Sequence, residues 1–390
     1  MLRFQTAGES HGQALIALVS GLPAGIPVDL AFINRELKRR QEGYGRGGRM
    51  KIETDQAEIL SGVRRSKTIG APVAMMIANR DWENWKEALP VEERENTPEK
   101  YRSLNPPRPG HADLAGCLKY NFHEARYVLE RASARESAAR VAAGALAKLL
   151  LRAFDIEVLS HVLAVGRVQT NVSATWNQIK EVDAKDETIF RCVDAQAEAE
   201  MKSAVDEILR TGDTLGGIFE VVAHNIPAGL GTHANWDERL DGLLAQAVMS
   251  LQAVKAVEIG TAIDNAVSLG SRVHDQIDYD RERQQFVRPE NHAGGLEGGI
   301  SNGEDIVVRG YLKPISTLRR PLQSVHMETK EVVKAAYERS DVCVVPAAGV
   351  AAEAMVALVL ARCLLEKFGG DSLQETQRNF EGYREQVRVF

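Results

Sequence analysis

The chain has 390 residues, of which 44% are hydrophobic, 26% charged and 6% aromatic. This composition is typical of a soluble globular protein and excludes the disordered, collagenous and membrane classes. The 48 basic and 54 acidic side chains give a net charge of −6, which argues against a general binder of nucleic acids or anionic membranes. We therefore expect any anion-binding site to be local.

We expect neither an interdomain linker nor a secretory signal in this chain. Since no Ser/Gly or Pro tract interrupts it, residues 1–390 are expected to form one domain. The first residues contain no apolar segment of a secretory signal, and the four cysteines show no spacing typical of zinc sites or disulfides. We predict a cytoplasmic protein that neither spans a membrane nor binds a metal.

Short β-branched runs alternate with Ala- and Leu-rich periodic segments, and these predict strands and helices respectively. The strands are expected at residues 14–19, 156–165, 217–223 and 305–311, and the helices at residues 130–154, 236–257 and 347–368. Because these helices carry few charges, we expect them to be buried on most sides, as in the inner layer of a sandwich.

Two further patterns concern the connections between these elements. Residues 21–28 and 225–232 share a Pro-Ala-Gly core, and each follows a strand-like run. They are either two similar turns or the trace of a duplicated strand–turn–helix unit. The charge-dense residues 81–100 and 271–292 are expected to be solvated surface loops.

The most basic segment covers residues 35–51, with seven basic and two acidic side chains. Its second half interleaves arginines with glycines, so that the backbone can approach a ligand while guanidinium groups supply paired donors. A small anionic molecule fits this pattern better than a polyanion does. The alternative is a flexible basic loop.

Three other segments combine cations with groups suited to anions. Residues 131–137 open the Ala-rich helix, where backbone N–H groups favour phosphate, although Ser133 and Glu136 also match a capping box. Residues 339–341 hold an arginine and an aspartate, which could equally form a surface ion pair. Residues 313–317 form a turn with a lysine and hydroxyls, or an ordinary strand exit.

Two histidines lie in settings that suit proton transfer. Glycines flank His11 and are expected to expose its ring, whereas prolines before His111 restrict its backbone. Near arginines, each could act as a general acid on an anion near neutral pH, although a lone histidine is often structural.

The glycine-rich residues 294–303 match neither a Walker A motif nor a Rossmann fingerprint. The chain also has no nucleophile elbow, HExxH or paired-carboxylate motif. We therefore rank covalent and metal mechanisms low.

Together these motifs resemble the chorismate synthase family. The resemblance is carried by nine blocks in order along the chain: GESHG (8–12), RRQEGYGRGGRMKIE (39–53), SGVR (61–64), PRPGHADL (107–114), RASARESAARVAAGA (131–145), GDTLGG (212–217), GGLEGGISNG (294–303), KPISTL (313–318) and RSDVCVVPAAGV (339–350). It implies an α+β fold, a β-α-β sandwich with central Ala-rich helices, usually assembled as a homotetramer.

The resemblance also implies an activity: a 1,4-anti-elimination of phosphate from 5-enolpyruvylshikimate 3-phosphate, giving chorismate. The reaction would require reduced FMN without net redox change, with NADPH as a source of electrons. The catalytic groups would be His11, His111 and Asp341. His11 would protonate the departing phosphate, His111 would stabilise charge on the reduced flavin, and Asp341 would relay the proton lost from the substrate ring.

The binding residues follow from the same resemblance. The substrate anions would be held by Ser10, Arg46, Arg49, Arg135 and Arg339. The flavin contacts would fall on Arg131, Ala132, Ser133, Gln252, Ala253, Gly298, Lys313, Pro314, Ile315, Ser316, Thr317 and Arg339. Arg40 and Arg46 match positions assigned to NADP. A flavin oxidoreductase and an RNA-binding protein are the alternatives, which net electron transfer and steep salt dependence respectively would distinguish.

Overall fold

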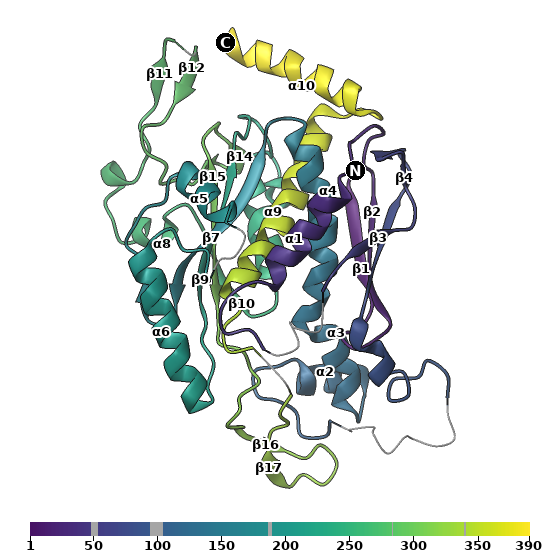
Figure 1. Cartoon of the computed structure of the whole chain (residues 1–390). Coiled ribbons are helices and arrows are strands. Elements are labelled where there is room, and N and C mark those ends of the chain that lie inside the picture. Colours follow the sequence, from purple (N-terminus) through teal and green to yellow (C-terminus); the bar gives the residue numbers. More distant parts are fainter. Residues whose placement is uncertain (48–53, 94–103, 186–188, 283, 339–340) are drawn as a thin grey trace.

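Two antiparallel sheets face each other across a layer of helices (Figure 1). The computed structural model describes residues 1–47, 54–93, 104–185, 189–282, 284–338 and 341–390. The first sheet has the order β1 (Arg3–Ala7), β2 (Ala14–Ser20), β6 (Val73–Ala78), β3 (Ala57–Ile59). The second has the order β10 (Val254–Ile259), β15 (Ile306–Leu312), β9 (Gly217–His224), β7 (Glu157–Val165), β8 (Val168–Gln169).

The helical layer is built on α4 (Ser137–Arg152) and α9 (Val345–Phe368), which pack against each other. Helix α4 also contacts the first sheet and α9 the second, while α1 (Leu30–Gln41) and α7 (Leu240–Met249) complete the layer. The two central helices approach very closely, because a Cβ at Gly144 would lie 2.3 Å from the Cβ of Ala354. The expected α+β sandwich with Ala-rich central helices is therefore observed.

Smaller elements surround the three layers. The outer helices are α2 (Asp113–Tyr120), α3 (Ala125–Ala132), α5 (Trp176–Asp183), α6 (Ala195–Thr211), α8 (Ala262–Asn265) and α10 (Leu373–Arg388). The two-stranded pairs are β4 (Val63–Arg64) with β5 (Lys67–Thr68), β11 (Asp278–Asp280) with β12 (Gln285–Val287), β13 (Leu296–Glu297) with β14 (Ile300–Ser301), and β16 (Gln323–Val325) with β17 (Val332–Lys334). Helices α2 and α3 and the pair β16–β17 gather at one end of the sandwich (Figure 1).

The four predicted strands and the last predicted helix are confirmed within one or two residues, but two helix predictions were too long. Residues 130–154 divide into α3, a 3₁₀ turn at Ala134–Glu136 and α4, because Ser133 is extended (φ −62°, ψ 140°). Residues 236–257 end as a helix at Met249, and the left-handed Ala253 (φ 69°) turns the chain into β10. The polar residues 271–292 include the hairpin β11–β12.

Helix α9 is long and apolar enough to cross a membrane, but it is mostly buried inside the protein. It also carries Glu353, a fully buried carboxylate. Arg39 of α1 donates two hydrogen bonds to Glu353, at 2.7 and 2.8 Å, and Lys148 of α4 donates a third. These contacts lower the pKa of Glu353 despite its burial. The carboxylate on α9 therefore forms ion pairs with both α1 and α4.

Candidate active site

His11 lies in the loop between β1 and β2, and it is held by Glu130 near the end of α3. The Nδ1 atom of His11 is 2.9 Å from one carboxylate oxygen of Glu130, and the backbone N–H of His11 donates to the other at 2.7 Å. The backbone N–H of Ser10 donates to the Glu130 carbonyl at 2.9 Å. Three contacts thus join the Ser10–His11 segment to one residue.

The His11 ring is largely covered, so the expectation that flanking glycines expose it was wrong. Only 12% of its side chain is accessible, because Trp85 packs on the ring with centroids 4.1 Å apart. The guanidinium of Arg126 lies over Trp85 and donates to Glu338 at 2.7 Å. The ring is therefore immobilised rather than solvated.

Asn79, at the end of β6, joins the His11 loop to the predicted substrate residue Arg135. Its side-chain amide donates to the carbonyls of Glu9 and Gly12, at 3.1 and 2.7 Å. Its side-chain oxygen accepts hydrogen bonds from Nε and Nη2 of Arg135, at 3.1 and 2.9 Å. A buried amide thus fixes an arginine beside the loop that carries Ser10 and His11.

Two of the predicted arginines share one buried carboxylate. Arg135 donates to both oxygens of Asp55, at 2.6 and 2.7 Å, and Arg40 donates to the second oxygen at 2.7 Å. Although burial opposes ionisation, the two arginines lower the pKa of Asp55. Arg40, Asp55 and Arg135 therefore form a rigid ionised group with an excess positive charge.

Burial and the neighbouring cations both act on the pKa of Arg40. Burial, together with the neighbouring Arg135 and Arg46, lowers this pKa to about 10, in spite of the opposing effect of Asp55. Its Nε atom is buried without a hydrogen-bond partner among the described residues. An anion placed here would offset this charge, which agrees with the predicted local anion site.

Arg46 and Asp341 bring the basic loop to the start of α9. Arg46 Nε lies 3.3 Å from one carboxylate oxygen of Asp341, and the backbone N–H of Gly47 donates to the other oxygen at 2.5 Å. The backbone N–H of Val342 donates to the Gly45 carbonyl at 2.8 Å. The predicted catalytic carboxylate thus forms an ion pair with a predicted substrate arginine. Arg49 and Arg339, also predicted to bind substrate, lie outside the described residues.

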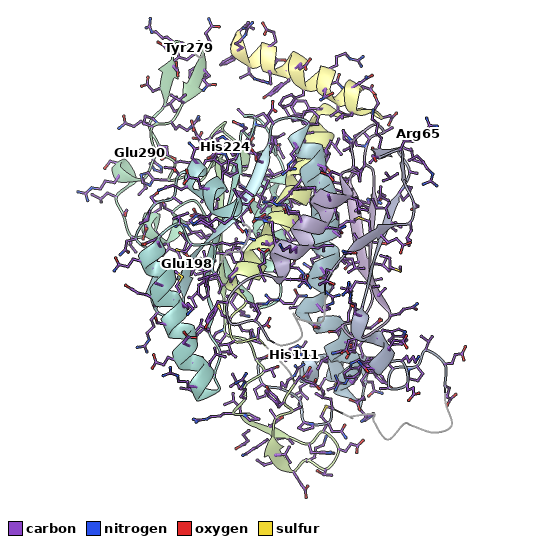
Figure 2. The ribbon with its side chains drawn as sticks, in the orientation of Figure 1. Arg65, His111, Glu198, His224, Tyr279 and Glu290 are labelled. Atoms are coloured by element: carbon purple, nitrogen blue, oxygen red, sulfur yellow. The ribbon has the colours of Figure 1, made fainter. Side chains whose placement is uncertain are left out.

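His111 lies just before α2, at the end of the sandwich where α2, α3 and β16–β17 gather (Figure 2). Its Nδ1 atom is 2.5 Å from Asp113, whose two oxygens also accept hydrogen bonds from Arg108. Although burial opposes it, contacts with His111 and Arg108 lower the pKa of Asp113. The same Arg108 donates to the hydroxyl of Thr317 at 3.0 Å. His111 is therefore fixed beside the predicted flavin turn 313–317.

The predicted flavin residues form a series of contacts. Lys313 donates from its ammonium group to the Gly110 carbonyl, and from its backbone N–H to the Ala253 carbonyl at 3.0 Å. Gln252 donates to Glu136 at 3.2 Å. Arg131 lies 3.8 Å from the same carboxylate and hydrogen-bonds to Thr6, which lines a surface pocket of about 420 Å³.

Gly298, also predicted to contact the flavin, is bound by a different residue. Its carbonyl accepts from Arg239, directly before α7, whereas Gln252 follows the other end of this helix. Helix α7, which lies between Arg239 and Gln252 in the chain, is about 15 Å long. The predicted capping box at Ser133 is also absent: the Ser133 hydroxyl accepts from the Arg135 N–H, and the Glu136 side chain bonds to Thr6 and Arg140.

Sequence reasoning missed the groups that orient the site, which are Asp55, Asn79, Trp85, Arg108, Asp113, Arg126 and Glu130. Arg108 and Asp113 flank His111 within one motif, so their spacing could have identified them. The others come from distant parts of the chain. Trp85 even lies in a segment that we expected to be a solvated loop.

One cluster among the described residues has ligand atoms close enough for a metal ion, and it is formed by Asp275, Glu290 and His292. Both oxygens of Asp275 already accept backbone N–H groups, and Glu290 pairs with His292 at 3.3 Å. Figure 2 shows Glu290 well away from His111. The contacts within the cluster account for its geometry.

The chain is similar to known proteins over its whole length. Residues 2–365 match the chorismate synthase family. Chorismate synthases from Koribacter versatilis and Acidobacterium capsulatum are 65% and 66% identical to this chain over the full length of both proteins. A crystal structure of chorismate synthase aligns with a TM-score of 0.79 and 40% identity, covering 100% of this chain and 99% of that one. These alignments cover the whole of this chain.

Proposed function

Because the chain belongs to the chorismate synthase family, whose enzymes carry out the last step of the shikimate pathway, we propose that it eliminates phosphate from 5-enolpyruvylshikimate 3-phosphate. In this 1,4-anti-elimination a ring proton and phosphate leave from opposite faces of the substrate, and chorismate remains. The substrate is a small molecule with a phosphate and two carboxylates. Its site must therefore supply several fixed positive charges.

The observation that carries this proposal is the buried group of Arg40, Arg135 and Asp55 beside the His11 loop. Its net charge is positive, and the pKa of Arg40 is lowered to about 10, first by burial and then by neighbouring cations. A bound phosphate or carboxylate would be stabilised here by preorganised guanidinium groups in a site of low dielectric constant. We propose that Ser10, Arg46, Arg49, Arg135 and Arg339 hold the substrate anions.

His11 is the group that we propose as the general acid for the departing phosphate. Its loop is joined through Asn79 to Arg135, so an anion bound by Arg135 would lie near the ring. A positioned histidine can lower the barrier for such a proton transfer by a factor of roughly 10²–10⁴. We propose Asp341 as the carboxylate that carries away the ring proton, since Gly47 and Arg46 fix its orientation.

The donor set around His111 fits reduced FMN. Lys313, Thr317 and Arg108 could hold its phosphate, while Arg131, Gln252 and Ala253 offer polar contacts close by. We include Ala132, Ser133, Gly298, Pro314, Ile315, Ser316 and Arg339 in this site. Reduced FMN supplies the electron-rich ring that the elimination requires. We propose that His111, oriented by Asp113, stabilises negative charge beside it, and that Arg40 and Arg46 can also contact NADPH.

The cellular setting follows from the resemblance to the family alone. We propose a cytoplasmic homotetramer that binds neither nucleic acid nor membrane. The net charge of −6 supports the absence of a general polyanion partner.

An anaerobic assay tests the proposed reaction. The purified protein is incubated with 5-enolpyruvylshikimate 3-phosphate and chemically reduced FMN, and chorismate absorbance and released phosphate are followed together. We expect equal amounts of both products with reduced FMN and none with oxidised FMN. Tight binding of FMN without either product would contradict the proposal and favour a flavoprotein acting on a different substrate.

A further inference from the structure

Glu130 makes more contacts with the His11 segment than a structural ion pair requires. Its side chain accepts from the backbone N–H of His11 at 2.7 Å and contacts Nδ1 at 2.9 Å, while its carbonyl accepts from the N–H of Ser10. We propose that Glu130 is a positioning residue, which holds the His11 ring in one orientation and one tautomer for proton transfer. This inference rests on the proposed role of His11 as the general acid.

The hydrogen bond to Glu130 determines which ring nitrogen of His11 can exchange a proton with substrate. The pKa of Glu130 is lowered, since contacts with His11 outweigh the opposing effect of burial, and an ionised carboxylate can only accept. Nδ1 must therefore be the donor. When the imidazolium gives up a proton, it gives up the one on Nε2, and the carboxylate stabilises the Nδ1–H tautomer that remains. A carboxylate plays the same orienting role in Ser-His-Asp triads.

The surroundings of Glu130 keep this contact in place. Its side chain is only 3% exposed, and its nearest arginine is Arg126, whose Nη1 lies 3.5 Å away and makes no hydrogen bond within the part of the chain that the structure describes. Trp85 packs on a face of the His11 ring. Because both the carboxylate and the ring are confined, the ring cannot rotate without breaking a buried charge-assisted hydrogen bond.

The second histidine of the site differs in this respect. Asp113, which contacts His111, also accepts three hydrogen bonds from Arg108, on its side-chain and backbone nitrogens. Its charge is therefore shared between a histidine and an arginine. The Glu130 carboxylate has hydrogen bonds from His11 alone among the described residues. The carboxylate that contacts His11, the proposed proton donor, is therefore shared with fewer hydrogen-bond donors than the carboxylate that contacts His111.

The first test is a spectroscopic measurement on the unaltered protein. Nitrogen-15 NMR of histidine-labelled protein distinguishes protonated from unprotonated ring nitrogens, and the His11 signals are assigned by their loss in His11→Ala. We expect neutral His11 to carry its proton on Nδ1. A neutral His11 with its proton on Nε2 would overturn the proposal, whether or not any Glu130 variant folds.

The second test is Glu130→Gln, which preserves the shape of the side chain but offers an amide N–H₂ group to Nδ1. We expect kcat for chorismate formation to fall by roughly 10²–10³ with KM changed less than about threefold, because the wrong tautomer affects the transition state more than binding. The His11 signals should shift toward the Nε2–H form. The matched control is Glu220→Gln, which alters another buried Glu–His pair, Glu220 with His161 at 2.9 Å, in the second sheet. Its kcat should remain within about threefold of wild type.

The outcomes separate this inference from the proposed function. A Glu130→Gln variant with wild-type kcat, alongside a His11→Ala variant that has lost activity, would overturn the positioning role and leave the lyase intact. If the unaltered protein makes no chorismate, the proposed function fails. The tautomer of His11 then still decides whether Glu130 orients the ring.

Discussion

The Asp55→Asn substitution probes the group that we regard as the centre of the anion site. Asp55 accepts three hydrogen bonds of 2.6–2.7 Å from Arg40 and Arg135, and its side chain is fully buried. Removing one partner of a buried ion pair costs about 3–5 kcal/mol, because the remaining charge is left uncompensated. Since asparagine keeps one acceptor oxygen, we expect the lower end of this range, about 3 kcal/mol.

Urea unfolding at neutral pH measures this cost, with Asp241→Asn as the matched control. Asp241 pairs with Arg239 at the surface, where both side chains are about one third exposed, so its loss should cost about 0–1 kcal/mol. The Asp55 variant should unfold at a lower urea concentration with an unchanged slope. A cost below about 1 kcal/mol would refute the idea that Asp55 compensates two buried arginines.

The stability difference between wild type and Asp55→Asn should decrease at low pH. The pKa of Asp55 is lower in the folded protein than its ordinary value of 3.8, so its ionised form stabilises the fold above that pH. This contribution is lost as the pH falls through the lower, folded-state pKa. The difference in stability between wild type and Asp55→Asn should therefore be constant from pH 5 to 8, a window of about three units, and should narrow below about pH 4.

Three further predictions concern the helical layer and the thiols. Gly144→Val should destabilise the protein by at least about 1–3 kcal/mol in urea unfolding, because α4 and α9 leave no room for a side chain; an unchanged midpoint would contradict this packing. In the same assay, Glu353→Gln should lower the free energy of unfolding by about 3–5 kcal/mol, because it breaks a buried ion pair. Glu366→Gln, which alters an exposed ion pair, should lower it by about 0–1 kcal/mol. Equal effects of the two substitutions would contradict a buried ion network. All four cysteines are buried, and burial raises the pKa of Cys343 to about 11, so Ellman's reagent should label four thiols rapidly only after unfolding.

The layered fold could be predicted because its elements have strong local patterns. The strand at residues 217–223 and the helix at residues 347–368 are mostly apolar and mostly buried, whereas the strand at residues 14–19 buries every second side chain, Leu15, Ala17 and Val19. The misplaced helix boundaries lie near single backbone conformations: Ser133 is extended between α3 and α4, and the left-handed Ala253 follows the end of α7. The helical spacing of apolar residues continues past these positions, so it does not show where the helix stops and the chain turns.

The two candidate histidines stand out in the sequence, but most of the groups that contact them do not. His11 and His111 stand in short motifs of glycine and proline, which are visible in one sequence. Their environment depends on contacts across the chain: His11 bonds to Glu130, 119 residues away, and Arg135 bonds to Asp55, 80 residues away. Such pairs have no local signal, and the expected exposure of His11 was wrong because Trp85 covers it.

The number of electrons used per turnover tests the central claim, elimination without net redox change. Chorismate formed and reduced flavin oxidised are measured together under strict anaerobiosis, with substrate in large excess over flavin. We predict many chorismate molecules for each flavin oxidised, with equal release of phosphate. Oxidation of one reduced flavin, or of one NADPH, for each product formed would contradict the lyase mechanism and identify an oxidoreductase instead.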